Sequence, residues 1–284
     1  MNQKELYLWG KSELEKIPIQ EASIKTRKLL EFVLKQTRSQ MICNELEEVS
    51  LEKQKEYEKQ IEKIKQGMPI QYITHVQEFM GLEFYVDENV LIPQPDTEVV
   101  VETAIQFIND SHTEICILDL CTGSGCIGIS IAKNMKNARV VLSDIQEKSL
   151  AIAQKNAIQN KVEKNIKMVQ SNLFEKLKNY QFDTIVSNPP YIETSEIATL
   201  SKEVQQEPKI ALDGGEDGLF FYNKILKEAS SYLKPKGYLV LEIGYNQANA
   251  ILKIAEQTKK WKIVTLQAIK DLGGNDRVLV FQKN

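Results

Sequence analysis

The chain has 284 residues, of which 42% are hydrophobic and 26% are charged, and its formal net charge is −3. This composition is typical of a globular protein with one large domain and a smaller companion. The weakly acidic balance argues against a dedicated nucleic-acid-binding protein, which usually carries a basic surface.

The sequence contains no signal for secretion or membrane insertion. The N-terminal stretch lacks the apolar segment of a signal peptide, and no apolar run approaches the ~20 residues of a membrane helix. The four cysteines form no CxxC pair, which favours reduced thiols without a metal or disulfide role. We therefore expect a cytoplasmic protein with no bound metal. His75 and His112 are isolated, and we assign neither a catalytic role.

Residues 1–68 are expected to form a small helical domain. Ser50 is a suitable N-cap for a charged helix that ends at Gly67. The apolar face expected on this helix is narrow and consists of Leu51, Tyr57, Ile61 and Ile64. Two interpretations remain open for the domain: a bundle that packs against another element, or a recognition domain for a protein substrate.

Residues 69–95 have a different character and are predicted to form a β-hairpin linker between two domains. The aromatic residues Phe79, Phe84 and Tyr85 either line a substrate entry or pack between the domains.

The remaining segment, residues 96–284, is predicted to begin with a helix capped by Asp96 or Thr97. Apolar runs then alternate with helical patterns, and a helix over 216–234 is expected to end at Pro235 and Gly237. The strands are predicted at 115–120, 139–144, 166–171, 182–187, 237–244, 262–269 and 277–283. This alternation indicates an α/β fold with a mostly parallel seven-stranded sheet, helices on both faces and an antiparallel edge.

The first predicted strand runs into a glycine-rich turn, Cys121-Thr122-Gly123-Ser124-Gly125, which precedes a helix. Such a turn lets a nucleotide-type ligand approach the main chain. The second strand ends at Asp144, at about the distance along the chain where an acidic residue binds ribose hydroxyls. Gly128 completes a spacing that a dinucleotide-dependent dehydrogenase would also show, but such an enzyme would not need the motif that follows the fourth strand.

That motif is Asn188-Pro189-Pro190-Tyr191. The two prolines cannot donate to a sheet and therefore stop it, which leaves an amide side chain, carbonyl groups and an aromatic ring on a stiff loop. This arrangement suits a planar group that carries an NH2. After the third strand, Asn172 either hydrogen-bonds an adenine amine or serves as a turn former.

The segment from Ile115 to Tyr191 resembles a class I S-adenosylmethionine-dependent methyltransferase, with DLCTGSG as the cofactor loop. Asn-Pro-Pro-Tyr motifs occur in enzymes that methylate planar NH2 nitrogens, of adenine or of glutamine. The resemblance implies a Rossmann-like fold and S-adenosylmethionine as cofactor. It also implies a set of cofactor-binding residues: Cys121, Thr122, Gly123, Ser124, Gly125, Asp144, Asn172, Leu173 and Asn188.

Three further segments, 69–98, 207–222 and 270–282, resemble the HemK/PrmC family, the glutamine N5-methyltransferases of peptide chain release factors. The resemblance implies methyl transfer to the glutamine of the GGQ motif. Residues 188–191 would then bind the substrate. Asn188 and the Pro189 carbonyl would accept its two N–H groups, and Tyr191 would pack against the amide.

Release factors are accordingly the expected partners of a monomeric enzyme, with no nucleic-acid or membrane partner. Two alternatives remain open from the residues themselves. One is an amino-methyltransferase of nucleic acid, which the motif suits equally well. The other is a non-catalytic protein that keeps the fold and binds the cofactor.

Overall fold

The computed structural model describes residues 1–108 and 114–284, so His112 lies outside the described residues. The chain forms two compact units. The first consists of Met1–His75 and Leu200–Gln206, and the second of Val76–Thr199 and Glu207–Asn284. Within the described ranges, no helix has both the length and the apolar character needed to cross a membrane.

The first unit is helical, as its sequence predicts. Its helices are α1 (Gln3–Glu15), α2 (Ala22–Leu34), α3 (Arg38–Cys43), α4 (Leu51–Lys65) and α5 (Ile70–Thr74). The predicted cap of α4 is confirmed, because the Ser50 side chain accepts a hydrogen bond from the Lys53 amide. Gly67 follows the helix with φ +100°, a conformation that favours glycine.

The α4 face that packs into this unit differs from the predicted one at a single position. Tyr57, Ile61 and Ile64 are buried, but Leu51 is 74% exposed. Gln54 takes its place because it lies three residues before Tyr57 on the same helical row, and its Nε2 donates to the Val49 carbonyl at 2.7 Å. The buried residues that α4 meets are Leu6, Leu14, Leu29, Leu30 and Val33.

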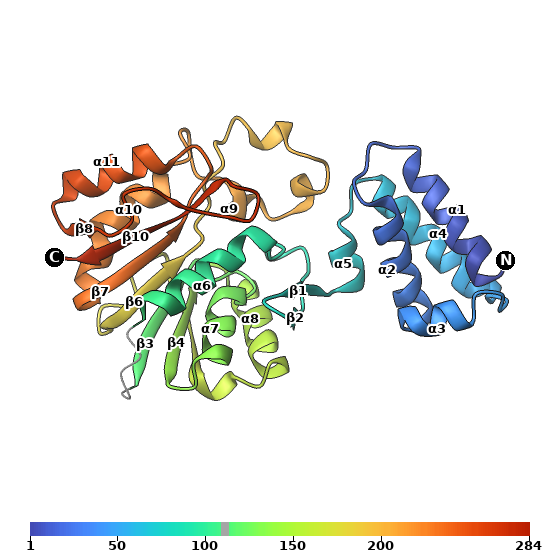
Figure 1. Cartoon of the computed structure of the whole chain (residues 1–284), viewed down its shortest axis with the longest axis horizontal. Helices are drawn as coiled ribbons and strands as arrows, with labels where there is room; N and C mark the ends of the chain where they lie inside the picture. The colour runs from blue at the N-terminus through green and yellow to red at the C-terminus, as the bar shows by residue number, and fades with distance from the viewer. Residues whose placement is uncertain (109–113) are drawn as a thin grey trace. The chain divides into compact units, whose positions relative to one another are not determined.

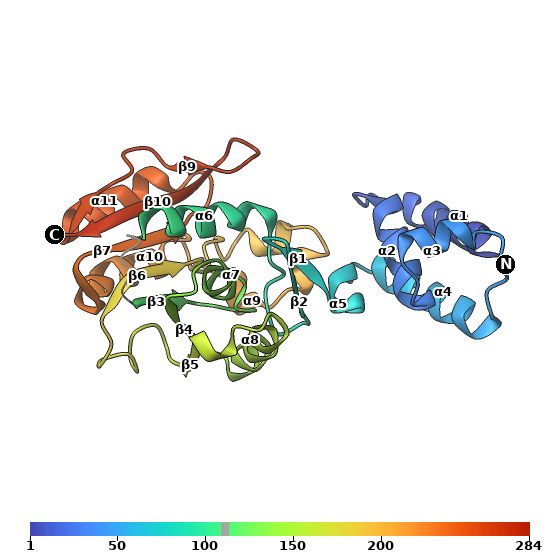
Figure 2. The same ribbon diagram turned by 60° about the horizontal axis from the view of Figure 1, so that its bottom comes forward.

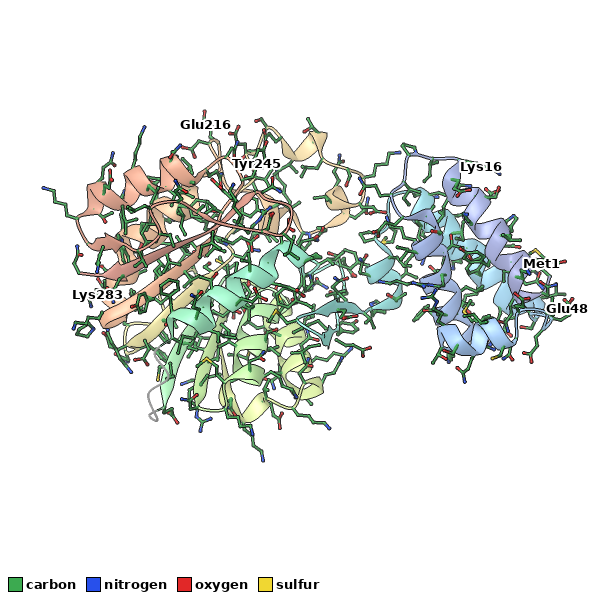
Figure 3. The ribbon with its side chains drawn as sticks, viewed as in Figure 1. Met1, Lys16, Glu48, Glu216, Tyr245 and Lys283 are labelled. Carbon is green, nitrogen blue, oxygen red and sulfur yellow. The ribbon has the colours of Figure 1, made fainter. Side chains whose placement is uncertain are left out.

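Two ion pairs join segments of this unit that are far apart in the sequence. The Met1 amino group lies 3.4 Å from Glu48, and both residues are labelled in Figure 3. Lys25 of α2 pairs with Glu203, which ties the distant segment Leu200–Gln206 to the helices. Lys25 is largely buried, so this second pair is less screened by solvent than the first.

The predicted hairpin is confirmed, but it is shorter than residues 69–95. Its strands are β1 (Gln77–Phe79) and β2 (Leu82–Phe84), which pair antiparallel. Met80 and Gly81 both have positive φ, as a two-residue turn of this hand requires. Phe79 and Phe84 pack in the core of the second unit, where their rings meet edge to face at 6.0 Å.

The second unit contains the predicted mostly parallel sheet (Figure 1). The strand order is β5-β4-β3-β6-β7-β10-β8, with β9 pairing beside β10. Strands β3 to β7 are parallel, and β10 is antiparallel to its neighbours. The bounds are Ile115–Leu120 (β3), Ala138–Asp144 (β4), Ile166–Gln170 (β5), Phe182–Ser187 (β6), Leu233–Glu242 (β7), Trp261–Ile263 (β8), Ile269–Lys270 (β9) and Asp276–Lys283 (β10).

The predicted strand over 262–269 is wrong, because it divides into β8 and β9. Ile263 pairs with Phe281, and Ile269 pairs with Val278. The chain therefore advances six residues while its partner β10 advances three, so the intervening residues loop away from the sheet. Leu266 lies in this loop and is 81% exposed.

Helices cover both faces of the sheet (Figures 1 and 2), and alternate residues of β10 belong to two separate cores. One core contains Val278 and Val280 and is covered by α6 (Glu98–Phe107), α7 (Cys126–Asn134) and α8 (Glu147–Gln159). The other contains Leu279 and Phe281 and is covered by α10 (Phe220–Glu228) and α11 (Ala248–Thr258). Burial on both faces explains why these strands read as continuous apolar runs.

One predicted helix has the wrong bounds. The helix expected over 216–234 is α10, which ends at Glu228 and is followed by a 3-10 turn. Pro235 and Gly237 lie within β7, at an irregular stretch of its pairing with β6 where the missing proline donor is tolerated. The predicted start of α6 is confirmed, because Thr97 is its N-cap, although the Thr97 side chain makes no capping hydrogen bond and the residue also ends a 3-10 turn (Pro95–Thr97).

The side chain of Asn156 on α8 connects the hairpin to the turn after β3. Its Nδ2 donates to the carbonyls of Tyr85 and Ser124 at 3.0 and 2.9 Å, and its Oδ1 accepts from the Tyr85 amide at 2.7 Å. We expect Asn156→Ala to lower the free energy of unfolding by about 3 kcal/mol, because it removes these bonds at a fully buried position. Urea denaturation measures the change. The exposed Gln154→Ala on the same helix is the control, and an equal effect of both substitutions would contradict the assignment.

Candidate functional site

A cavity of about 300 Å³ lies at the carboxyl ends of the parallel strands of the second unit. The chain passes from β3 to β4 and β5 in one direction along the sheet, and then from β6 to β7 in the other. The cavity therefore lies at the point where the strand order reverses, which is where open α/β sheets bind ligands. Nine of the predicted site residues line it: Cys121, Thr122, Gly123, Ser124, Asp144, Asn172, Leu173, Asn188 and Pro190.

The glycine-rich turn after β3 uses its two glycines differently. Gly123 has φ +53°, and a Cβ added there would meet no atom within 4 Å, so a ligand can approach its backbone. A Cβ on Gly125 would lie 2.8 Å from the Ile129 side chain. Gly125 does not line the cavity; it lets α7 begin close against the sheet. Cys121 also has positive φ, at +62°.

Asp119, the next-to-last residue of β3, holds this turn from beneath. Its fully buried Oδ2 accepts from the Thr122 hydroxyl at 2.6 Å and from the Gly128 amide at 2.9 Å. Burial raises the pKa of Asp119 to about 7, although both hydrogen bonds oppose the rise. No role was predicted for Asp119, but a lone carboxylate inside an apolar strand is a signal that could have identified it.

Asp144 at the end of β4 reaches the same turn. Its Oδ2 accepts from the Gly123 amide and its Oδ1 from the Gln146 amide, both at 2.9 Å. Burial raises the pKa of Asp144, and these backbone hydrogen bonds oppose the rise. A carboxylate has about four acceptor positions. The Ile145 amide also hydrogen-bonds this carboxylate, so about one position is left for a ligand hydroxyl.

The two residues after β5 form a third side of the cavity. Asn172 Nδ2 donates to Glu175 at 2.8 Å, which leaves its oxygen to accept a hydrogen bond from a ligand. Leu173 has φ +48° and supplies a mostly buried apolar wall.

The motif after β6 is joined to β3 by a buried hydrogen bond, from the Ser187 hydroxyl to the Leu120 carbonyl at 2.6 Å. Asn188 is half-buried, and its Nδ2 donates to the Thr97 hydroxyl at 3.3 Å. Since the amide nitrogen is engaged with Thr97, the Asn188 oxygen is the atom left for a ligand. Pro190 lines the cavity beside it.

The structure does not bring Pro189 or Tyr191 to the cavity wall. The Tyr191 phenol receives a hydrogen bond from Arg277, and burial raises the pKa of this phenol well above its ordinary value. A Cβ added to Gly214 would lie 2.7 Å from the Tyr191 Cα, so the main chain of the following loop is pressed against the motif.

A segment before α6 also lines the cavity, and no binding role was predicted for its residues. The residues of this segment that line the cavity are Asn89, Val90, Leu91, Pro93, Gln94 and Thr97. The buried Glu207 holds this segment, because its Oε2 accepts from the Ile92 amide at 2.9 Å. Contacts between residues so far apart in the chain leave no local pattern in the sequence.

No group of three or more His, Cys, Asp and Glu side chains within residues 1–108 and 114–284 is arranged to hold a metal ion. All four cysteines are free thiols.

Comparisons with known proteins match both units. Residues 5–74 match the family model of the PrmC N-terminal domain, and residues 103–265 match that of the methyltransferase small domain. The second match spans more than half of the chain.

Two bacterial relatives have the name release factor glutamine methyltransferase. The one from Clostridium botulinum is 37% identical, with 99% of each chain covered. The one from Fusobacterium nucleatum is 47% identical over 77% of this chain, and the matched part spans 61% of that relative. Among solved structures, a methyltransferase from Pyrococcus furiosus has a TM-score of 0.55 at 19% identity, over 80% of this chain and 98% of the other, which shows a shared fold.

The buried Asp119 should make stability depend on pH. Its pKa is 3.8 in an exposed setting and about 7 in the folded chain, so the folded state binds more protons than the unfolded state between these values. The stabilisation from protonated Asp119 is complete below about pH 4 and is lost as pH rises through about 7. We expect Asp119→Asn to flatten the fall in melting temperature between about pH 5 and 8. The exposed Glu216→Gln is the control, and an unchanged slope for Asp119→Asn would contradict this origin of the pH dependence.

Proposed function

Because the chain belongs to the family of release factor glutamine methyltransferases, we propose that it methylates the side-chain N5 amide of the glutamine in the GGQ motif of peptide chain release factors. The observation that carries this proposal is the position of Asn188. It leaves β6 at the point where the strand order reverses, with its nitrogen bonded to Thr97 and its oxygen free to accept from the target amide.

The cofactor of this family of enzymes is S-adenosylmethionine, and the residues of the cavity fit it. The open backbone at Gly123 admits close approach, Asp144 has acceptor capacity for a ribose hydroxyl, and Leu173 gives an apolar surface for a base. When bound, the cofactor supplies an electrophilic methyl group on a sulfonium. The lining between the turn and Asn188 is continuous, so one ligand can contact Asp144 and reach the target amide.

We assign the chemistry of this chain to positioning and charge stabilisation. An amide nitrogen is a weak nucleophile because its lone pair is delocalised into the carbonyl. Asn188 Oδ1 accepts one N–H of the target amide, and the Pro189 carbonyl, which is not at the cavity wall in this structure, accepts the other once the substrate has bound. Together they fix the NH2 and stabilise positive charge as it develops on nitrogen. No side chain is required as a general base, because the amide proton becomes acidic as the new bond forms.

The predicted role of Tyr191 needs a change of conformation. In the present structure its ring is directed to Arg277 and is away from the cavity. Packing against the target amide would therefore require a rotation of this side chain when the substrate binds.

We further propose that residues 1–68 recognise the release factor, that 69–95 link this domain to the rest, and that 96–284 carry out methyl transfer. The match of residues 5–74 to a domain model of the same family supports a separate N-terminal domain, although the match extends six residues beyond residue 68. The proposed enzyme acts as a monomer in the cytoplasm, where its substrates take part in translation, and needs no nucleic acid for binding.

We expect Asn188→Ala to abolish methyl transfer while cofactor binding largely persists, because the substitution removes an acceptor for the target amide and leaves Asp144 and Gly123 in place. Radiolabelled methyl transfer to a purified release factor measures the activity, and calorimetry measures cofactor affinity. The exposed Asn284→Ala is the matched control. Full activity of Asn188→Ala would rule out the role assigned to this amide.

The same assay tests the substrate. Label should enter an intact release factor, but not a variant with GGQ changed to GGA, nor bulk DNA or RNA. Label in nucleic acid would favour the alternative amino-methyltransferase, and label in none of these would favour a protein that only binds the cofactor.

We expect Asp144→Ala to weaken cofactor affinity roughly 10- to 100-fold, since hydrogen bonds to a charged group are worth about 1.5–3 kcal/mol. Calorimetric titration with S-adenosylmethionine measures the change. The exposed Glu147→Ala on the following helix is a control, provided that its melting temperature is unchanged. An unaltered dissociation constant for Asp144→Ala would exclude Asp144 from the cofactor site.

A further inference from the structure

The three neighbouring strands β6, β7 and β10 bring polar residues together at the end of the sheet from which Asn188 leaves β6. Ser187 of β6 pairs with Leu241 of β7, so the next residues along the two parallel strands are Asn188 and Glu242. Glu242 in turn pairs with Val278 of β10, and Arg277 adjoins it. The register of the sheet therefore places a carboxylate directly beside the amide that is expected to bind the substrate.

Glu242 is 2% exposed and does not line the cavity. Its carboxylate accepts hydrogen bonds from the side chains of Thr97 and Asn188. Its Oε2 has no hydrogen-bond partner within residues 1–108 and 114–284. A buried carboxylate that keeps spare acceptor capacity is costly, which indicates that it has a role beyond packing.

The neighbours of Glu242 offset its burial only in part, because Arg277 lowers its pKa but burial raises the pKa by more. Arg277 lies next to Val278, the residue of β10 that pairs with Glu242. Its Nη2 already donates to Asp96 at 3.1 Å and to Asp271 at 2.9 Å. The other titratable groups that interact with Glu242 come from the 3-10 turn before α6, the loop after β6, α10 and α7. All are neutral or acidic: Asp96, Tyr191, Tyr222 and Cys126. Burial raises the pKa of Glu242 to about 7.

We propose that Glu242 is a positioning residue that, together with Thr97, holds the Asn188 amide with its nitrogen turned inward and its oxygen turned to the substrate. The proposal rests on the function proposed above. An ionised carboxylate can only accept hydrogen bonds, so it selects the inward-facing Nδ2 of Asn188. A protonated carboxyl group can donate to Oδ1 instead, which permits the amide to turn over and present NH2 to another NH2.

Because ionised Glu242 selects one orientation of the Asn188 amide, the activity should depend on pH. The productive orientation requires ionised Glu242, so kcat should rise as pH increases through about 7 and level off above it. Asp119 titrates in the same range but lies under the cofactor turn, so its effect is on cofactor binding. Saturating S-adenosylmethionine removes that contribution from kcat.

The test compares wild-type protein with Glu242→Gln, using a release factor as substrate between about pH 6 and 8.5. Glutamine has the same shape as glutamate but always carries donor N–H groups, so it imitates the protonated carboxyl. We expect kcat at about pH 8 to fall on the order of 10- to 100-fold, as small displacements of positioning groups do. The rise of kcat near pH 7 should also disappear, while the dissociation constant for S-adenosylmethionine stays unchanged. The exposed Glu256→Gln is the matched control.

A second pair of variants keeps the proposal testable if Glu242→Gln does not fold. Thr97→Val removes the hydroxyl between the two side chains at nearly constant volume, and it should lower kcat without altering cofactor affinity. Thr97→Ser, which restores the hydroxyl, should recover most of the loss.

Wild-type kcat and an unchanged pH profile in Glu242→Gln would overturn the proposal, and so would full activity of Thr97→Val. Failure of the wild-type protein to methylate any release factor would instead contradict the proposed function, so the two failures are distinguishable.

Discussion

The site depends on the parallel register between β3 and β6 at the point where the strand order reverses. The buried bond from Ser187 to the Leu120 carbonyl fixes where both strands end. A slip of one residue would turn every side chain of a strand to the opposite face and carry Asn188 away from the cavity. The glycine-rich turn and the Asn-Pro-Pro-Tyr motif, separated by more than sixty residues in the chain, become neighbours through this register.

Carboxylates support the cavity both at its wall and behind it: Asp144 lines the wall, and the buried Asp119 and Glu242 do not. Asp119, Asp144 and Glu242 each lie at or next to the carboxyl end of a strand, and burial raises the pKa of all three. Each accepts from a group that shapes the site: the turn hydroxyl of Thr122, the amide of Gly123, or the side chain of Asn188. The cost of burying these groups is offset by the orientation that they impose.

The sequence predicts the parts of this architecture that local patterns encode. Strands 115–120 and 182–187 appear at their predicted bounds, because burial on both faces makes them unbroken apolar runs. Three other features could not be predicted from local patterns. They are the cavity lining within 89–97, the hydrogen bond from Ile92 to Glu207, and the direction of the Tyr191 ring toward Arg277. Each depends on a partner far along the chain, and the same holds for the loop that divides 262–269, which follows from pairing with β10.

The close approach of the loop after β6 affects how this enzyme could be redesigned. Added Cβ atoms at Gly214 and Gly218 would lie 2.7 Å from the Tyr191 Cα and 2.4 Å from the Tyr191 carbonyl oxygen. Gln247 Nε2 also donates to that carbonyl, at 3.0 Å. The loop is therefore a support for the motif and not an independent appendage. A graft intended to change the substrate must keep both glycines, because a side chain at either position would move the motif itself.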